Sequence, residues 1–142
     1  MSGQNVETVR RVYEAWNRDD PDAALAVMQP DVELHNPTDV FLGTQSLYRG
    51  HGGLRDFWKA AKEPWDYFES HIERALEKDD TVVTVVRFEA VGRESGAKVG
   101  LSFANVWELK GGLIAKFGAY SSLEKALEVA GFSEQEAHED SL

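Results

Sequence analysis

Apolar residues in the first half of the chain recur at the spacing of helices. One apolar face predicts a first helix, and it is formed by Val6, Val9, Val12, Tyr13 and Trp16. Asp20 suits the N-cap of a second helix, because Pro21 then takes the first helical position, where no amide donor is needed. Pro30 ends that helix, and Pro64 ends a third helix that begins near residue 52.

Alternation of apolar and polar residues predicts strands in the rest of the chain. Residues 31–37 alternate first, and residues 38–50 are irregular. Alternation then returns in four stretches separated by short turns, at residues 67–77, 81–92, 99–109 and 113–120. A short helix ending at Gly131 follows. Early helices and late hairpin strands are typical of an α+β domain, with a curved antiparallel sheet wrapped around the N-terminal helices as a cone open at one end.

Composition and length predict a single domain with an acidic tail. A length of 142 residues is enough for one domain with its own core, which we assign to residues 1–132. Residues 133–142 contain four acidic residues and no lysine or arginine, so we expect a solvated, disordered tail. The net charge of −10 argues against nucleic acid or an anionic membrane as a partner.

Several kinds of chemistry are disfavoured by the residues that are missing. The sequence has no cysteine, so it has no disulfide, no thiolate nucleophile and no cysteine-based zinc site. No three of its four histidines share the spacing of metal ligands, and we expect no metal and no other cofactor. No apolar run approaches the length of a membrane span, and the N-terminus lacks the apolar core of a signal peptide. We therefore expect a cytoplasmic protein.

The chain resembles a known superfamily in three stretches. They read VRRVYEAWNRDDPDAALAVMQPDVELHNP, YRGHGGLRDFW and ANVWELKGGLIAKFGAYSSLEKALEVAGF. Together they resemble the nuclear-transport-factor-2-like superfamily, and most closely its SnoaL-like branch, over residues 5–132. The resemblance implies a cystatin-like cone whose interior is a pocket. It does not imply one activity, because this fold hosts isomerases, cyclases, hydratases, epoxide hydrolases and plain binding proteins.

The resemblance also implies which side chains face the pocket. It places Arg87 and Glu89 inward on the strand at 81–92, with Asn36 inward on the first strand, and makes these three the catalytic candidates. The expected ligand-binding residues are Tyr13, Trp16, Leu34, Trp58, Phe103, Asn105, Trp107, Phe117 and Ala119. Two buried charges are costly unless they are paired, so an inward Arg87 and Glu89 would indicate a site. Two alternatives stay open, a structural ion pair and a strand that faces the other way.

Comparison with relatives of known mechanism leaves each catalytic set incomplete. Ketosteroid isomerases of this fold need carboxyl groups at positions where this chain has Asn36 and Asn105, and an amide cannot transfer a proton near pH 7. Limonene-type epoxide hydrolases fit better, because Asn36 matches their asparagine. Arg87 and Glu89 occupy the positions of their Arg-x-Asp motif, with glutamate in place of aspartate. Their water-activating aspartate, however, falls at Ala119.

Two classes of function remain open. The first is an enzyme acting on a small, mostly apolar organic molecule, with Glu89 as acid–base and Arg87 and the asparagines orienting the substrate. The second is a ligand-binding or dimerisation module without catalysis. In either case the resemblance implies a homodimer through the outer face of the sheet, to which we assign Val82, Thr84, Val86, Phe88, Ala104 and Val106.

Overall fold

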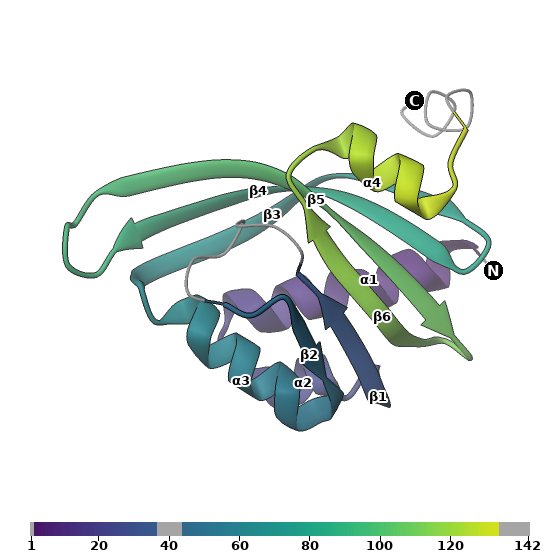
Figure 1. Ribbon diagram of the computed structural model, residues 1–142, viewed down its shortest axis with the longest axis horizontal. Coiled ribbons are helices and arrows are strands. Elements are labelled where there is room, and N and C mark those ends of the chain that lie inside the picture. The colour runs from purple at the N-terminus through teal and green to yellow at the C-terminus, as the bar shows by residue number, and fades with distance from the viewer. Residues whose placement is uncertain (1, 37–43, 134–142) are drawn as a thin grey trace.

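The computed structural model describes residues 2–36 and 44–133 (Figure 1). Four helices form in this part of the chain: α1 (Ser2–Asn17), α2 (Pro21–Leu25), α3 (Gly50–Lys62) and α4 (Leu123–Ala130). Six strands form one sheet: β1 (Met28–His35), β2 (Leu47–Arg49), β3 (Trp65–Lys78), β4 (Thr81–Gly92), β5 (Lys98–Lys110) and β6 (Leu113–Tyr120). The predicted α+β class is confirmed, while the short strand β2 lies where the sequence predicts no regular structure.

Local sequence explains where several elements begin and end. Asp20 caps α2 by accepting a hydrogen bond from the amide of Ala23, as its position before Pro21 predicts. Gly111 and Gly112 both have positive φ angles, which suits the tight turn between β5 and β6. Gly131 takes the left-handed conformation that ends α4.

The sheet has the strand order β2-β1-β6-β5-β4-β3 and is not closed. Every neighbouring pair is antiparallel except β1 and β6, which run parallel, so the sheet is mixed rather than purely antiparallel as predicted. Register shifts in β1, β3 and β5 mark bulges or irregularities, and bulges increase the bend and twist of strands. The result is the curved sheet that the sequence predicts.

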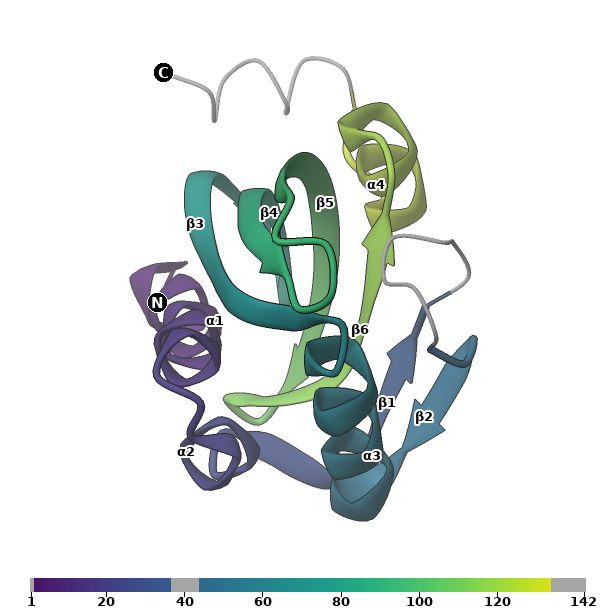
Figure 2. The same cartoon turned by 90° about the vertical axis from the view of Figure 1, so that its left-hand side faces the viewer.

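Helices cover both faces of the curved sheet. Figure 2 shows α1, α2 and α3 on the inner, concave side and α4 on the outer side. The inner core joins these three helices to the inward residues of the strands, among them Val82, Val86 and Phe88. A smaller outer core lies under α4 and is formed by Leu76, Val83, Ala104, Val106, Ala126 and Phe132.

This arrangement corrects the surface predicted for a homodimer. Val82, Thr84, Val86 and Phe88 are buried and belong to the inner face, because each lies opposite an inward residue of β5. Ala104 and Val106 do lie on the outer face, but α4 covers them. The homodimer itself stays a prediction, while the residues assigned to its interface are wrong.

The predicted acidic tail at 133–142 lies outside the described residues except for Ser133. Within the described ranges, no helix has the length and apolar character needed to cross a membrane.

Candidate functional site

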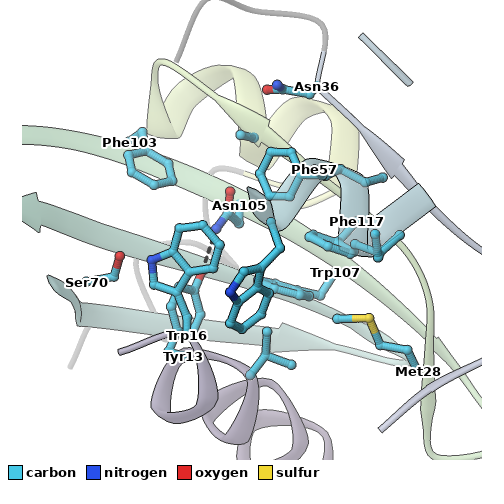
Figure 3. A pocket seen from close by; sticks show the side chains of 15 residues that line it. Tyr13, Trp16, Met28, Asn36, Phe57, Ser70, Phe103, Asn105, Trp107 and Phe117 are labelled. Atoms are coloured by element: carbon cyan, nitrogen blue, oxygen red, sulfur yellow. Dashed lines mark hydrogen bonds between the residues drawn. The ribbon is translucent and has the colours of Figure 1, made fainter. Parts of the chain in front are cut away.

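A cavity opens inside the cone, between the concave face of the sheet and helices α1 and α3 (Figure 3). Its volume is about 70 Å³, which corresponds to roughly five water molecules at 10–15 Å³ each. Fifteen residues line it: Val12, Tyr13, Trp16, Met28, Leu34, Asn36, Leu54, Phe57, Trp58, Ser70, Phe103, Asn105, Trp107, Phe117 and Ala119. None of these side chains carries a charge at neutral pH.

Most of the predicted site residues come together in this cavity. All nine expected ligand-binding residues line it, and Asn36 lines it as well. Ser70, Met28 and Leu54 also line it, although no prediction named them. Ser70 could have been found from the alternation of β3, because it lies between Phe68 and Ile72 on the same face.

Arg87 and Glu89 lie outside the cavity, and the prediction that they face the cone interior is wrong. Their side chains are 46% and 52% exposed, and they form an ion pair on the outer face, with Arg87 Nε 3.4 Å from Glu89 Oε1. The register between β4 and β5 explains the difference, because Arg87 lies opposite Ser102 whereas Asn105 lies opposite Thr84. Residues directly opposite share a face, so a shift of one residue turns a whole strand over.

A buried hydrogen-bond network crosses the floor of the cavity. Trp107 Nε1 donates to Thr84 Oγ1 at 3.0 Å, and Tyr13 Oη lies 2.8 Å from the same oxygen. Asn105 Nδ2 donates to Tyr13 Oη at 2.5 Å. The network joins α1 to β4 and β5 and holds the Asn105 side chain against Tyr13.

Tyr13 remains neutral in this environment. Burial raises the pKa of the Tyr13 hydroxyl to about 12, although hydrogen bonds from the same network lower it in part. A phenol with this pKa holds its proton throughout the physiological range. Tyr13 therefore acts as a hydrogen-bonding group at neutral pH and not as a base.

Asn36 is held at the end of β1 by three hydrogen bonds. Its Nδ2 donates to Thr44 Oγ1 at 2.6 Å and to the Gln45 carbonyl oxygen at 3.5 Å, and its backbone amide donates to the Ser46 carbonyl at 2.7 Å. The Asn36 residue is only 3% exposed. Its Oδ1 is buried without a hydrogen-bond partner among the described residues.

Ser70 is placed in the wall of the cavity by a side chain from α1. Asn17 accepts a hydrogen bond from the Ser70 amide at 2.8 Å through Oδ1 and donates to the Ser70 carbonyl at 2.9 Å through Nδ2. This pair of bonds ties the end of α1 to β3. The buried Ser70 side chain therefore lines the cavity from a fixed position.

Trp16 and Trp58 close one side of the cavity, and Lys62 holds them in place. The Lys62 ammonium lies 4.7 Å from the Trp16 ring, 4.6 Å from the Trp58 ring and 4.0 Å from the Phe68 ring. It also donates to Asp19 Oδ1 at 2.8 Å, an oxygen that accepts a 2.7 Å hydrogen bond from Trp58 Nε1. These contacts order the aromatic wall.

The electrostatics of this cluster come from burial and from the ion pair. Hydrogen bonds from Lys62 and Trp58 lower the pKa of the exposed Asp19 carboxyl. Burial lowers the pKa of the Lys62 ammonium, and its hydrogen bond to Asp19 offsets this only in part. Both pKa values fall, but for different reasons: the Asp19 carboxyl remains in water, where its hydrogen bonds dominate, whereas the Lys62 ammonium is largely buried, where loss of hydration dominates.

Metal ligands are not grouped in the described ranges. No cluster of three or more histidine, cysteine, aspartate or glutamate side chains there could hold a metal ion. His35 and His71 each lie against a glutamate, with Nε2 at 2.8 Å from Glu33 and 2.6 Å from Glu69 respectively.

Comparison with known proteins places the fold in a family. The family model described as a SnoaL-like domain matches residues 9–117. The chain belongs to the SnoaL-like family. Solved structures of the nuclear-transport-factor-2-like superfamily share its fold, which confirms the resemblance seen in the sequence. No curated protein matches the sequence significantly.

Three solved structures share the fold of this chain. An NTF2-like protein from Burkholderia pseudomallei is 22% identical with a TM-score of 0.75, covering 92% of this chain and 98% of its own. TerC, crystallised with polyporic acid, is 20% identical with a TM-score of 0.75, covering 90% and 98%. A protein with a ketosteroid isomerase-like fold from Catenulispora acidiphila, crystallised with trimethylamine, is 16% identical with a TM-score of 0.71, covering 89% and 94%.

Proposed function

We propose that the cone cavity binds a small, uncharged and largely apolar organic molecule. The observation that carries this proposal is the lining, which combines aromatic and aliphatic side chains with a few polar groups and no charge. Small-molecule sites are typically apolar with a few polar groups that fix orientation. An ion entering this cavity would lose its hydration without gaining a charged partner, which is costly.

The same lining argues against acid–base chemistry by the candidates from the sequence. Glu89 and Arg87 lie on the outer face, and the positions that carry carboxyl groups in relatives hold Asn36, Asn105 and Ala119. Tyr13 keeps its proton at neutral pH. An epoxide hydrolase of the limonene type would therefore lack its acid, its base and its arginine inside the cavity.

The similar structures support a small-molecule site without selecting the ligand. TerC was crystallised with polyporic acid and the Catenulispora protein with trimethylamine, which are chemically unlike. At identities of 20% and 16%, these structures share the fold with this chain, and the side chains of the cavity decide the ligand.

Calorimetric titration with three ligands of similar size tests this proposal. We expect p-cresol to bind, and benzoate and benzylammonium to bind at least about tenfold more weakly, because a buried charge without a partner costs well over 1.4 kcal/mol. Ala119→Leu should abolish binding, because Ala119 is only 3% exposed and its added carbons would fill the cavity.

The matched control for Ala119→Leu is Arg87→Ala, because Arg87 lies on the outer face. It should leave the affinity for p-cresol unchanged. Equal or tighter binding of either ion would contradict the proposal, and so would full p-cresol binding by Ala119→Leu.

A further inference from the structure

We propose that the cavity selects ligands that donate hydrogen bonds, because Asn105 presents an unpaired carbonyl oxygen to the ligand. The inference rests on the proposed function and deepens it by naming the ligand class: neutral phenols, alcohols or amides with an O–H or N–H group. It follows from the way each carboxamide is held by the protein.

Asn105 is hydrogen-bonded to Tyr13 through its amide nitrogen. Asn105 Nδ2 donates and Tyr13 Oη accepts in this 2.5 Å hydrogen bond. Oδ1 is then on the other side of the carboxamide, and Figure 3 shows it directed away from Tyr13. It makes no hydrogen bond to any residue in the described part of the chain.

The orientation of Asn36 is set by the segment that follows β1. Both of its Nδ2 hydrogen bonds go to protein oxygens, on Thr44 and Gln45. The Gln45 carbonyl can only accept, so a reversed carboxamide would place two acceptors against each other. Asn36 Oδ1 is the group left over, and it is buried without a partner within the described ranges.

The two oxygens differ in their access to the cavity. Asn36 Oδ1 is fully buried, so a ligand does not reach it. Asn105 Oδ1 lines the cavity, and a ligand that displaced water from it would leave it unpaired unless the ligand supplied an O–H or N–H group. A ligand ether or ketone oxygen near the same carbonyl would add a second unpaired acceptor. Ser70 favours neither a donor nor an acceptor on the ligand, because a hydroxyl can donate or accept.

Tyr13 acts as a positioning residue in this arrangement. With its proton retained, Tyr13 can accept from Asn105 and still donate to Thr84, whose oxygen also accepts from Trp107. Removing the Tyr13 hydroxyl would release the Asn105 carboxamide, which could then rotate and present its N–H groups to a ligand acceptor. Selectivity for donors should therefore depend on Tyr13.

The experiment compares three neutral ligands of related shape by calorimetry on the wild-type protein. These are toluene, p-cresol, which has a hydroxyl donor, and 4-methylanisole, whose methoxy oxygen can only accept. We expect p-cresol to bind about tenfold more tightly than 4-methylanisole, a typical effect of satisfying one buried acceptor. Binding of p-cresol no tighter than that of 4-methylanisole would overturn the donor requirement and leave the proposed function standing. Failure of all three ligands to bind would overturn the proposed function itself.

Two variants test the positioning role. In Tyr13→Phe, the preference for p-cresol over 4-methylanisole should fall from about tenfold to below about threefold, because the carboxamide is no longer fixed. Tyr120→Phe is the matched control, because Tyr120 packs against the outer core under α4, and it should keep the tenfold preference. An unchanged preference in Tyr13→Phe would show that Asn105 is oriented by something other than Tyr13. If Tyr13→Phe does not fold, the ligand comparison on the wild-type protein still decides the proposal.

Discussion

Tyr13 links the chemistry of the cavity to the stability of the fold. Its hydroxyl is buried in a network with Thr84, Asn105 and Trp107, and burial raises its pKa to about 12 from the ordinary value of 10.0. An unfolded chain would lose this proton near pH 10, whereas the folded protein keeps it. The folded state therefore binds more protons than the unfolded state between pH 10 and pH 12, so this group's contribution to stability falls as the pH rises through that window.

We predict that this loss can be isolated by comparing the wild-type protein with Tyr13→Phe. Between pH 9 and pH 11, the free energy of unfolding of the wild type should fall by about 1.4 kcal/mol more than that of the variant. Urea denaturation at the two pH values measures the difference. The other titrating groups are common to both proteins and cancel in the comparison. Identical losses in both proteins would show that Tyr13 has an ordinary pKa.

Much of the cavity could be predicted through the resemblance to the superfamily. It placed Phe103, Trp107 and Phe117 inward on the late strands and Trp16 at the pocket from the first helix, and all four line the cavity. The hydrogen bonds of Asn105 and Asn36 could not be predicted in the same way. They depend on Tyr13 and Thr44, which the fold brings to them from another element and from across a loop.

At the level of elements, strand β4 shows how a register decides the chemistry of a face. Its inward positions, Val82, Thr84, Val86 and Phe88, are all buried, and Arg87 and Glu89 alternate with them on the outer side. The sequence alone left the facing of this strand open, since either set could be turned inward. The choice is made by pairing with β5, where Val86 lies opposite Phe103 and Thr84 lies opposite Asn105.

The neighbouring residues Arg87 and Phe88 therefore provide a direct test of the facing of β4. We predict that Phe88→Ala lowers the free energy of unfolding by about 3–5 kcal/mol, because it removes a buried ring from the inner core. Arg87→Ala should change it by only about 0.5 kcal/mol, since the Arg87–Glu89 pair is solvent-exposed. Urea unfolding of both variants measures the contrast. A cost for Arg87→Ala close to that of Phe88→Ala would mean that the charged pair is buried after all.

The elements that could be predicted from sequence are those with strong local signals. Pro21 and Asp20 marked the start of α2, and Gly111 and Gly112 marked the turn before β6. Strand β2 was missed because it has only three residues, too few to show alternation. The parallel pairing of β1 with β6 was missed because it joins segments about 80 residues apart and leaves no local pattern.

At the scale of the whole molecule, the curved sheet separates two surfaces with different roles. The concave side holds the uncharged cavity, and the convex side carries α4 together with the exposed Arg87–Glu89 pair. The charged residues that give the chain its net charge of −10 therefore lie outside the cavity lining. The interior is suited to a neutral molecule although the protein as a whole is strongly acidic.

A crystal structure of the protein with p-cresol tests the central claim most directly, because it locates both the ring and the hydroxyl group. We predict that the ring lies inside the cone among the aromatic side chains of the lining. The hydroxyl oxygen should lie about 2.7 Å from Asn105 Oδ1, the distance of an O–H···O hydrogen bond. A p-cresol molecule bound outside the cone, or one inside it whose hydroxyl makes no hydrogen bond to Asn105, would contradict the account.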